Sequence, residues 1–352
     1  MRVAVYYNNR DIRVVEQEIP RIGAGELLLK VIASGICGSD LMEWYQAHKT
    51  PCVLGHEVAG EVAQVGAGVT RFKVGDRLVA THHVPCNQCR YCLTNRHTVC
   101  ETLRTTHFDP GGYAEYLRLT PLHVDRGVYT LPPELGWEEA SMTEPVASAL
   151  RAQRKVRVGA GQLVLVIGSG LSGILHIQLA RAFGAEQIVA ADINPSRLKA
   201  AQRFGADHVI KGDEDIPQRL KELCQGRLAD VVILTTGVTP AILQGLKSVD
   251  RGGTVLLYAP AAQGATIPVP VNDLFFRHDA TLTTSYAASP VDLIKALEWM
   301  QAGKLRLKEM VTHRLDLSEI GRGFQLVGEA KESLKVIIFP HLKTNNKTIT
   351  DS

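Results

Sequence analysis

Two hydrophobic patterns divide the chain, and each predicts a different kind of fold. In the first third, short segments that mix apolar and polar residues are separated by glycine, which is typical of β-strands joined by turns. This part is therefore predicted to be a β-rich domain. We expect its strands at residues 3–7, 26–33, 58–65, 76–81 and 114–119.

The middle of the chain alternates apolar runs with helical periodicity. Leu163–Ile167 is an unbroken apolar run, as expected for a strand buried on both faces of a parallel sheet. Strands that alternate with helices predict a doubly wound α/β fold. We expect further strands at residues 187–191, 231–234 and 254–258, and helices at 174–184, 196–204, 216–224 and 241–249.

The last part of the chain predicts helices at residues 290–301 and 317–328 and a closing strand at 335–339. Residues 343–352 are polar and are predicted to be disordered. With 352 residues, the chain exceeds what one hydrophobic core usually serves, so two domains are expected.

Charge and cysteine content narrow the possible environments. A net charge of +3 spread over this length does not indicate a nucleic-acid partner. No apolar run approaches the ~20 residues that cross a bilayer, and the N-terminus lacks the pattern of a signal peptide. Seven cysteines, four of them at metal spacing, fit a reducing compartment, so we expect a cytoplasmic protein without a membrane partner.

Four cysteines form a Cys-x2-Cys-x2-Cys-x7-Cys series, within residues 85–101. Four thiolates complete a tetrahedral shell around Zn²⁺ and leave no position for a substrate, so the series predicts a structural zinc. An iron–sulfur cluster is the nearest competitor, but its bacterial series ends in Cys-x3-Cys-Pro. Disulfides or free thiols would also account for four cysteines. The four residues are Cys86, Cys89, Cys92 and Cys100.

A glycine-rich turn follows the buried strand and opens a helix, which is the context of a dinucleotide-binding loop. The pyrophosphate is expected on the helix N-terminus. Asp192, at the end of the next strand, should accept hydrogen bonds from the adenosine ribose and repel a 2′-phosphate, so NAD is predicted. Arg197 could pair with that phosphate, which keeps NADP as the alternative. The cofactor-binding candidates are Gly168, Gly170, Leu171, Ser172, Gly173, Asp192 and Arg197.

A second, mixed set of metal-binding residues precedes the cysteine series. Cys37, His56 and Glu57 offer a thiolate, an imidazole and a carboxylate, which is the kind of ligand set found in catalytic zinc sites. The chain is therefore expected to hold two zinc ions, one structural and one catalytic.

The chain resembles the zinc-dependent medium-chain dehydrogenase/reductase superfamily, and within it the polyol and threonine dehydrogenase branch. The resemblance runs along nearly the whole sequence, through GICGSD, LGHEVAGEV, VGDRL, the four-cysteine segment, GGYAEY, the glycine loop, RGGTVLLY and SLKVII. It implies a GroES-like catalytic domain at residues 1–148 and 286–352, and a Rossmann NAD-binding domain at 149–285.

The resemblance also implies roles for individual residues. Cys37 and His56 are expected to bind the catalytic zinc, and Asp40 to orient His56. Glu57 looks like a carboxylate that moves on and off the metal, and Glu144 like a third protein ligand. Zn²⁺ with one thiolate and one carboxylate is formally neutral, so we expect the two glutamates to alternate. Which of them binds in the resting state stays open.

The implied reaction is the NAD-linked oxidation of a secondary alcohol, in which Ser39 removes the alcohol proton. Many relatives place a proton-relaying histidine where this chain has Met42, and a thioether carries no proton. The proton must then leave through water or the cofactor ribose, or through Glu43 or His48.

The expected substrate is a small alcohol or ketone of the polyol, sugar alcohol, cyclitol or amino alcohol class, and the expected assembly is a homodimer or homotetramer. Two rival functions stay open: a zinc-free enone or quinone reductase of the same superfamily, and a non-catalytic NAD-binding scaffold. Candidates to line the substrate pocket are Trp44, Tyr45, Tyr113, Ser285 and Tyr286.

Overall fold

The computed structural model describes residues 1–342, which form two compact units. Of the described residues, unit 1 contains 1–144, 288–302 and 307–342, and unit 2 contains 145–287 and 303–306. The chain enters unit 2 at 144/145 and leaves it at 287/288, where the predicted boundaries were 148/149 and 285/286, and it returns to unit 2 for residues 303–306. The predicted disordered tail, residues 343–352, lies outside the described residues.

Unit 2 is built on a six-stranded parallel sheet in the order β11-β10-β9-β12-β13-β14. All five residues of β9 are buried, which explains its unbroken apolar sequence. This strand order is that of a doubly wound dinucleotide-binding fold. The strands are β9 (Leu163–Ile167), β10 (Gln187–Asp192), β11 (His208–Lys211), β12 (Ala229–Leu234), β13 (Val249–Leu257) and β14 (Thr281–Thr284).

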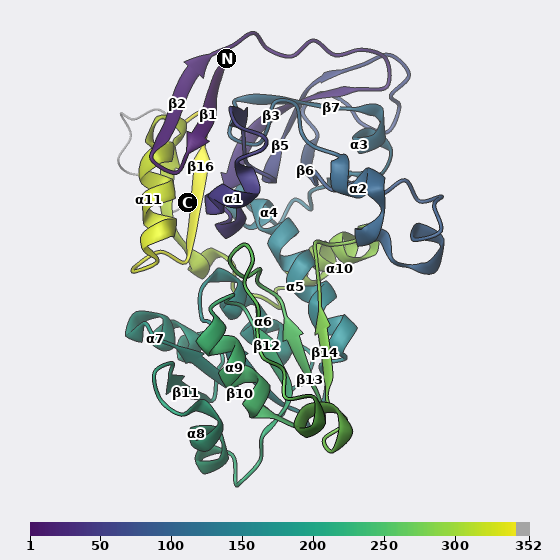
Figure 1. Ribbon diagram of the computed structural model, residues 1–352. Coiled ribbons are helices and arrows are strands. Elements are labelled where there is room, and N and C mark those ends of the chain that lie inside the picture. The colour runs from purple at the N-terminus through teal and green to yellow at the C-terminus, as the bar shows by residue number, and fades with distance from the viewer. Residues whose placement is uncertain (343–352) are drawn as a thin grey trace. The chain divides into compact units, whose positions relative to one another are not determined.

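Helices alternate with these strands and pack on the sheet, as the teal-to-green part of Figure 1 shows. Two of them have helix-starting signals in the sequence: the side chains of Asn194 and Asp215 accept hydrogen bonds from backbone N–H groups in the first turns of α7 and α8. The helices are α6 (Leu171–Ala182), α7 (Pro195–Arg203), α8 (Ile216–Leu223) and α9 (Thr239–Ser248), with one π-turn at Asn272–Phe276.

Unit 1 contains a small and a large sheet. The small sheet has the order β2-β1-β4, and the large one the order β15-β16-β3-β5-β6-β8, with β7 also paired to β3. The strands are β1 (Arg2–Asn8), β2 (Asp11–Glu16), β3 (Leu27–Gly35), β4 (Cys52–Val53), β5 (Glu57–Val65), β6 (Arg77–Ala80), β7 (Tyr116–Leu119), β8 (Val128–Thr130), β15 (Val311–Asp316) and β16 (Lys335–Phe339).

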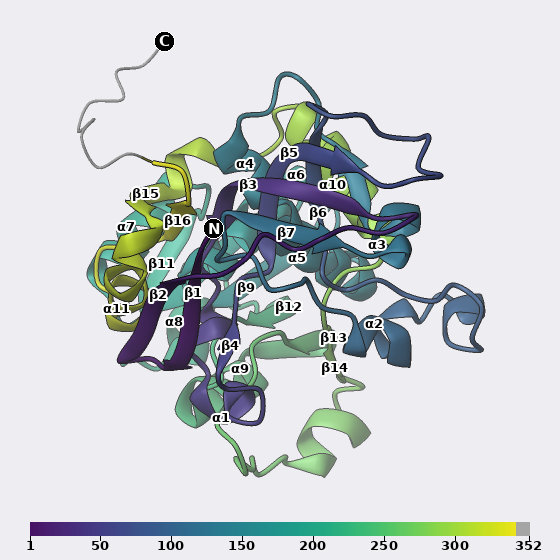
Figure 2. The same cartoon turned by 90° about the horizontal axis from the view of Figure 1, so that it is seen from above.

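Distant parts of the sequence meet in the core of unit 1. Figure 2 shows β1 and β2 beside α11 (Ile320–Glu329), and their apolar side chains share one buried cluster. The longer helices are α5 (Thr143–Val156), which begins in unit 1, and α10 (Pro290–Gln301). The short ones are α1 (Glu43–Gln46), α2 (Glu101–Thr105), α3 (Pro121–Arg126) and α4 (Trp137–Ser141), with 3-10 turns at Gly38–Leu41, Cys92–Thr94, His97–Val99, Lys308–Met310 and Leu317–Glu319.

The predicted fold class, a β-rich domain with a doubly wound parallel sheet, is confirmed. The predicted helix at 317–328 is a 3-10 turn followed by α11. Strands β2, β4, β8, β11, β14 and β15 were not predicted, because each has at most six residues and shows no clear alternation of apolar and polar positions. Within residues 1–342, no helix is long and apolar enough to cross a membrane.

Candidate metal centres and cofactor loop

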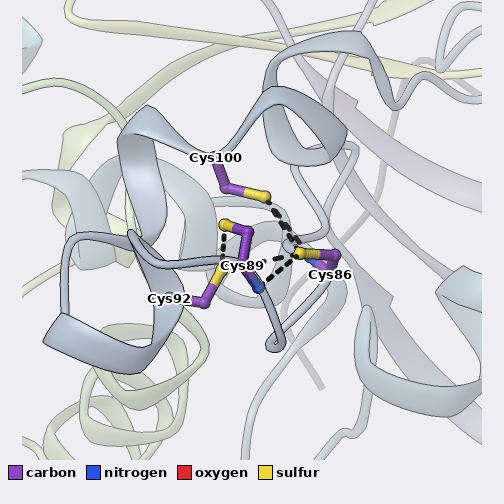
Figure 3. Close-up of side chains that lie close together, drawn as sticks. All are labelled: Cys86, Cys89, Cys92 and Cys100. Atoms are coloured by element: carbon purple, nitrogen blue, oxygen red, sulfur yellow. Dashed lines mark hydrogen bonds between the residues drawn. The ribbon is translucent and has the colours of Figure 1, made fainter.

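The four cysteines of the predicted structural site converge (Figure 3), and all four sulfur atoms lie within 4.8 Å of one another. Neighbouring sulfurs are 3.6 Å apart for Cys89–Cys92 and for Cys86–Cys100, and 4.0 Å apart for Cys86–Cys92. A tetrahedral zinc with Zn–S bonds of ~2.3 Å would set its sulfurs about 3.8 Å apart. All seven cysteines of the chain are free thiols, so these four form no disulfides in this structure. The cluster therefore fits a structural zinc.

Backbone geometry prepares the cysteine cluster for a cation. Backbone N–H groups of Gln88 and Cys89 point at the Cys86 sulfur and lower the pKa of Cys86 to about 6. Burial instead raises the pKa of Cys92 to about 12. The Cys86 thiol is thus disposed to lose its proton, whereas a metal ion must displace the proton of Cys92 as it binds.

Strand register brings the second set of metal-binding residues together. β3 and β5 pair so that Gly35 lies opposite Glu57, and Cys37 and His56 stand just outside these paired ends. The donor atoms of Cys37, His56 and Glu57 lie within 4.8 Å of one another. Among the described residues, Glu57 Oε1 is buried without a hydrogen-bond partner. A buried carboxylate oxygen beside a thiolate and an imidazole is a suitable ligand for a divalent cation.

The other carboxylate oxygen of Glu57 pairs with Lys335, the first residue of β16. The Lys335 ammonium also donates a hydrogen bond of 3.1 Å to the Ile36 carbonyl. Gly35 lies next to this ion pair, and a Cβ on Gly35 would collide with both the Glu57 carboxylate and the Lys335 ammonium. The absence of a side chain at Gly35 therefore makes room for a fully buried ion pair.

His56 is oriented by a buried carboxylate. Asp40 Oδ1 lies 3.3 Å from His56 Nδ1. Burial opposes protonation of His56, but Asp40 and Cys37 outweigh it and hold the pKa of His56 well above its ordinary value. Burial also opposes the charge on Asp40, yet His56, Tyr113 and the Cys37 N–H together lower the pKa of Asp40. The pocket therefore favours positive charge at His56, which a metal ion would supply.

Ser39 and Glu144 were predicted to belong to the same site. The Ser39 hydroxyl donates to the Cys37 sulfur over 3.3 Å, so it lies beside a proposed ligand. Glu144 is the half-buried second residue of α5, and the three-residue group that converges within residues 1–342 does not include it. Its assignment as a metal ligand stays a prediction.

The glycine loop has the shape expected for a dinucleotide. Gly168 has φ +96°, and a Cβ there would collide with Thr235. Gly173 lies so close to the Gly168 carbonyl that no side chain fits between helix and strand. The three atoms nearest to a Cβ on Gly170 belong to the Arg197 guanidinium, at 3.7 Å or more, which is ordinary contact. The loop thus leaves backbone accessible where α6 begins, beside Leu171 and Ser172.

Asp192 ends β10 and closes the loop from one side. Its carboxylate accepts the Ser169 N–H over 2.6 Å and the Asn194 N–H over 2.8 Å. Asp192 therefore fixes the shape of the loop, while each carboxylate oxygen keeps a lone pair for a ligand.

Comparisons with known proteins agree with this geometry. Residues 23–133 match the alcohol dehydrogenase GroES-like domain family, and residues 173–302 match the zinc-binding dehydrogenase family. Sorbitol dehydrogenase of Bacillus subtilis is 30% identical over 351 residues, covering 97% of this chain and 98% of the relative. L-threonine 3-dehydrogenase of Thermococcus kodakarensis is 32% identical over 345 residues, covering 93% and 94%. The chain belongs to the zinc-dependent medium-chain dehydrogenases.

A solved structure extends the similarity to three dimensions. The alcohol dehydrogenase of Thermus sp. ATN1 has a TM-score of 0.86 and 29% identity, covering 96% of this chain and 99% of that one. The family prediction is thus confirmed, and with it an oxidoreductase that uses zinc and a nicotinamide cofactor.

Sequence reasoning missed several residues around the Cys37, His56 and Glu57 site of this dehydrogenase. It placed Lys335 only in an apolar closing strand, although a single charge in such a strand was a signal. The ring centroids of His82 and His56 are 4.8 Å apart, and those of His82 and His83 are 3.6 Å apart. Burial lowers the pKa of His83 to about 3, so this imidazole is neutral.

One candidate for the pocket lining was wrong. Tyr113 is only 1% exposed, and its hydroxyl donates to Asp40 Oδ2 over 2.5 Å. Tyr113 is thus part of the surroundings of His56. Its place in the GGYAEY motif gave no sign of this contact.

Proposed function

We propose that this dehydrogenase oxidises a secondary alcohol reversibly to a ketone, with NAD as the hydride acceptor. The substrate class is a polyol, sugar alcohol, cyclitol or amino alcohol, which the named sorbitol and threonine dehydrogenases support. One observation carries the proposal. The donor atoms of Cys37, His56 and Glu57 converge while an oxygen of Glu57 has no partner among residues 1–342.

The catalytic zinc would be held by Cys37, His56 and Glu57, with Glu144 as a further ligand. A zinc ion there supplies Lewis acidity, which lowers the pKa of an alcohol. Asp40 accepts from His56 Nδ1 and so leaves Nε2 as the donor atom for the metal. The contact with Asp40 would thus favour one tautomer of the ring.

We expected Glu57 and Glu144 to alternate as zinc ligands because both together would make the site anionic, and Lys335 changes this charge balance. Counting only Zn²⁺, one thiolate and two carboxylates, the site would be formally anionic. The Lys335 ammonium compensates the charge of Glu57. Both glutamates can therefore lie near the ion without a net negative charge, and alternation is not required on electrostatic grounds.

The glycine loop and Asp192 would hold the NAD. NAD bound there would supply the hydride acceptor for the alcohol carbon. The loop backbone would hold the pyrophosphate, and the Asp192 carboxylate would accept from the ribose and repel any 2′-phosphate as a like charge. The Arg197 guanidinium lies near Gly170, which supports Arg197 as the residue that would pair with a 2′-phosphate.

Ser39 is proposed to take the alcohol proton. Its hydroxyl lies beside Cys37, so it can reach a substrate oxygen at the same site. The proton then leaves through water or the cofactor ribose. Glu43 is exposed, and its carboxylate accepts from the Asn9 N–H over 3.0 Å, which favours a structural role for this neighbour.

The thiol-rich metal sites would need a reducing environment, so a cytoplasmic location is proposed. A homodimer or homotetramer is proposed from the family resemblance.

Metal content and a substrate panel test the proposed function together. The wild-type enzyme should contain two zinc ions per chain, and Cys37→Ser should retain one. Polyols, cyclitols, sugar phosphates and amino alcohols would be screened for NADH formation by absorbance. A wild-type enzyme with a single zinc, or one that reduces enones and oxidises none of these alcohols, would contradict the proposal.

A further inference from the structure

We propose that Tyr113 is a positioning residue for His56, because its buried hydroxyl holds Asp40 in the orientation in which Asp40 accepts from His56. The inference rests on the proposed function, since it assumes that His56 binds the catalytic metal. Tyr113 is not one of the three residues whose donor atoms converge at this site. It acts through Asp40 alone.

The hydrogen bonds around Asp40 carry the first step. One carboxylate oxygen, Oδ2, accepts from the Tyr113 hydroxyl over 2.5 Å and from the Cys37 N–H over 3.1 Å. The other, Oδ1, faces His56 Nδ1 at 3.3 Å. Asp40 is 1% exposed, so no bulk water competes for these positions. Tyr113 and Cys37 thus occupy one oxygen, and the second oxygen is left for the histidine.

The backbone of Tyr113 is attached to the segment that carries His56. The Tyr113 N–H donates to the Leu54 carbonyl over 3.0 Å, and the Gly112 N–H donates to the Gly55 carbonyl over 2.9 Å. Gly55 has φ +94°, and a Cβ there would collide with Tyr113. The tyrosine and the histidine are therefore held on one scaffold, so the hydroxyl is fixed relative to both Asp40 and His56.

The Tyr113 ring is held as firmly as its backbone. It packs edge-on against Phe324, with ring centroids 6.0 Å apart, and its hydroxyl is also 3.3 Å from the Gly35 carbonyl. Burial and the nearby Asp40 raise the pKa of Tyr113 well above its ordinary value. The hydroxyl therefore keeps its proton and acts as a donor, which a buried carboxylate needs.

The consequence is a chain of contacts from Phe324 through Tyr113 and Asp40 to His56. Groups that orient a metal-binding histidine typically change metal affinity by 10–100-fold when removed. Because Tyr113 acts one contact further out, we expect an effect near the lower end of that range.

The test compares two tyrosines of the same buried cluster. Tyr113→Phe removes the hydroxyl that reaches Asp40. Tyr6→Phe is the matched control: Tyr6 is 2% exposed, packs on Phe324 at 5.9 Å, and donates to Asn9 over 2.9 Å. Zinc release to a chromogenic chelator is followed for each purified protein, and Cys37→Ser identifies which phase belongs to the four-cysteine site.

We expect Tyr113→Phe to speed zinc release from the Cys37/His56 site by about tenfold and to leave the four-cysteine phase unchanged. With Co²⁺ in place of zinc, its absorption bands should shift, because the ligand field reports the orientation of His56. Tyr6→Phe should change neither quantity. In an Asp40→Asn background, Tyr113→Phe should add little, because residues that act through one another are not additive.

Several outcomes would overturn the inference. These are wild-type release from Tyr113→Phe, equal changes in both tyrosine variants, additive effects with Asp40→Asn, or insoluble Tyr113→Phe beside soluble Tyr6→Phe. A wild-type enzyme that holds zinc only in the four-cysteine site would instead contradict the proposed function. The two failures are thus distinguished by the wild-type metal content.

Discussion

The Lys335 ammonium and the Glu57 carboxylate form an ion pair in which both side chains have 0% exposure. The strands that carry them, β16 and β5, lie on opposite sides of β3, and Gly35 of β3 leaves the space that the pair occupies. Burying two charged groups away from water costs free energy unless each group is paired with the other. The pair therefore links the C-terminal strand to the proposed metal site. Removing either partner would leave the other charge buried and unpaired, which would destabilise the protein.

Lys335→Met should lower the free energy of unfolding by about 3–5 kcal/mol, because it leaves the Glu57 carboxylate buried without its cation. Methionine keeps most of the apolar stem, so the loss reports the charge. Urea unfolding of the metal-free protein measures it. Adding Glu57→Gln to Lys335→Met should recover part of the loss, since the second change removes the unpaired charge.

The matched control for this pair is Lys295→Met, which breaks the exposed ion pair between Lys295 and Glu298. Exposed pairs contribute little to stability, so its unfolding curve should stay close to that of the wild type. Equal effects of Lys335→Met and Lys295→Met would show that burial of the first pair has no energetic consequence.

Cys89→Ser should destabilise the protein while any folded fraction keeps its chemistry. A structural zinc contributes an apparent binding free energy of about 10–16 kcal/mol, so the loss of one ligand in four corresponds to ~3 kcal/mol. Thermal unfolding and turnover per folded enzyme are the measurements. Cys52→Ser, a half-buried thiol outside the cluster, is the control. A Cys89→Ser enzyme that is fully stable but inactive would mean that the two metal sites are assigned the wrong way round.

Local spacing predicted the four-cysteine cluster and the glycine loop because each lies within one short segment. The helix and strand periods likewise predicted most of unit 2, whose buried strands such as Leu163–Ile167 are strongly apolar. Interactions that depend on strand register could not be predicted from the sequence. That Gly35 pairs with Glu57, and Ile337 with Gly35, is set by the assembled sheet, and only then do Lys335 and Glu57 meet. The same holds for Tyr113, whose contact with Asp40 joins residues 73 positions apart.

Asp192 should decide the choice between NAD and NADP. Asp192→Asn removes the negative charge but keeps an oxygen that can accept the Ser169 N–H, so the loop is preserved. We expect the KM for NADP to fall by about tenfold, equivalent to ~1.4 kcal/mol, with a smaller change for NAD. Kinetics with both cofactors measure this.

Arg197→Ala in the Asp192→Asn background serves as the control for that gain. If Arg197 pairs with the 2′-phosphate once the like charge is gone, the gain should disappear. A wild-type enzyme that already prefers NADP would contradict the role assigned to Asp192.

Ser39 and Met42 together test the route of the alcohol proton. Since Ser39 is the side chain proposed to take that proton, Ser39→Ala should lower turnover by about 10²–10⁴-fold, as is typical for a positioned acid–base group. Met42→His should be tolerated and should raise the oxidation rate near neutral pH, because an imidazole with a pKa near ~6.5 can pass the proton to solvent. Turnover as a function of pH measures both effects. Glu43→Gln and His48→Gln are the controls, since both residues are exposed and should leave turnover unchanged. If either control abolished activity while Ser39→Ala remained nearly wild type, the proton would leave through that neighbour. A solvent-exposed carboxylate or imidazole would then transfer the proton in place of the half-buried Ser39 hydroxyl beside Cys37.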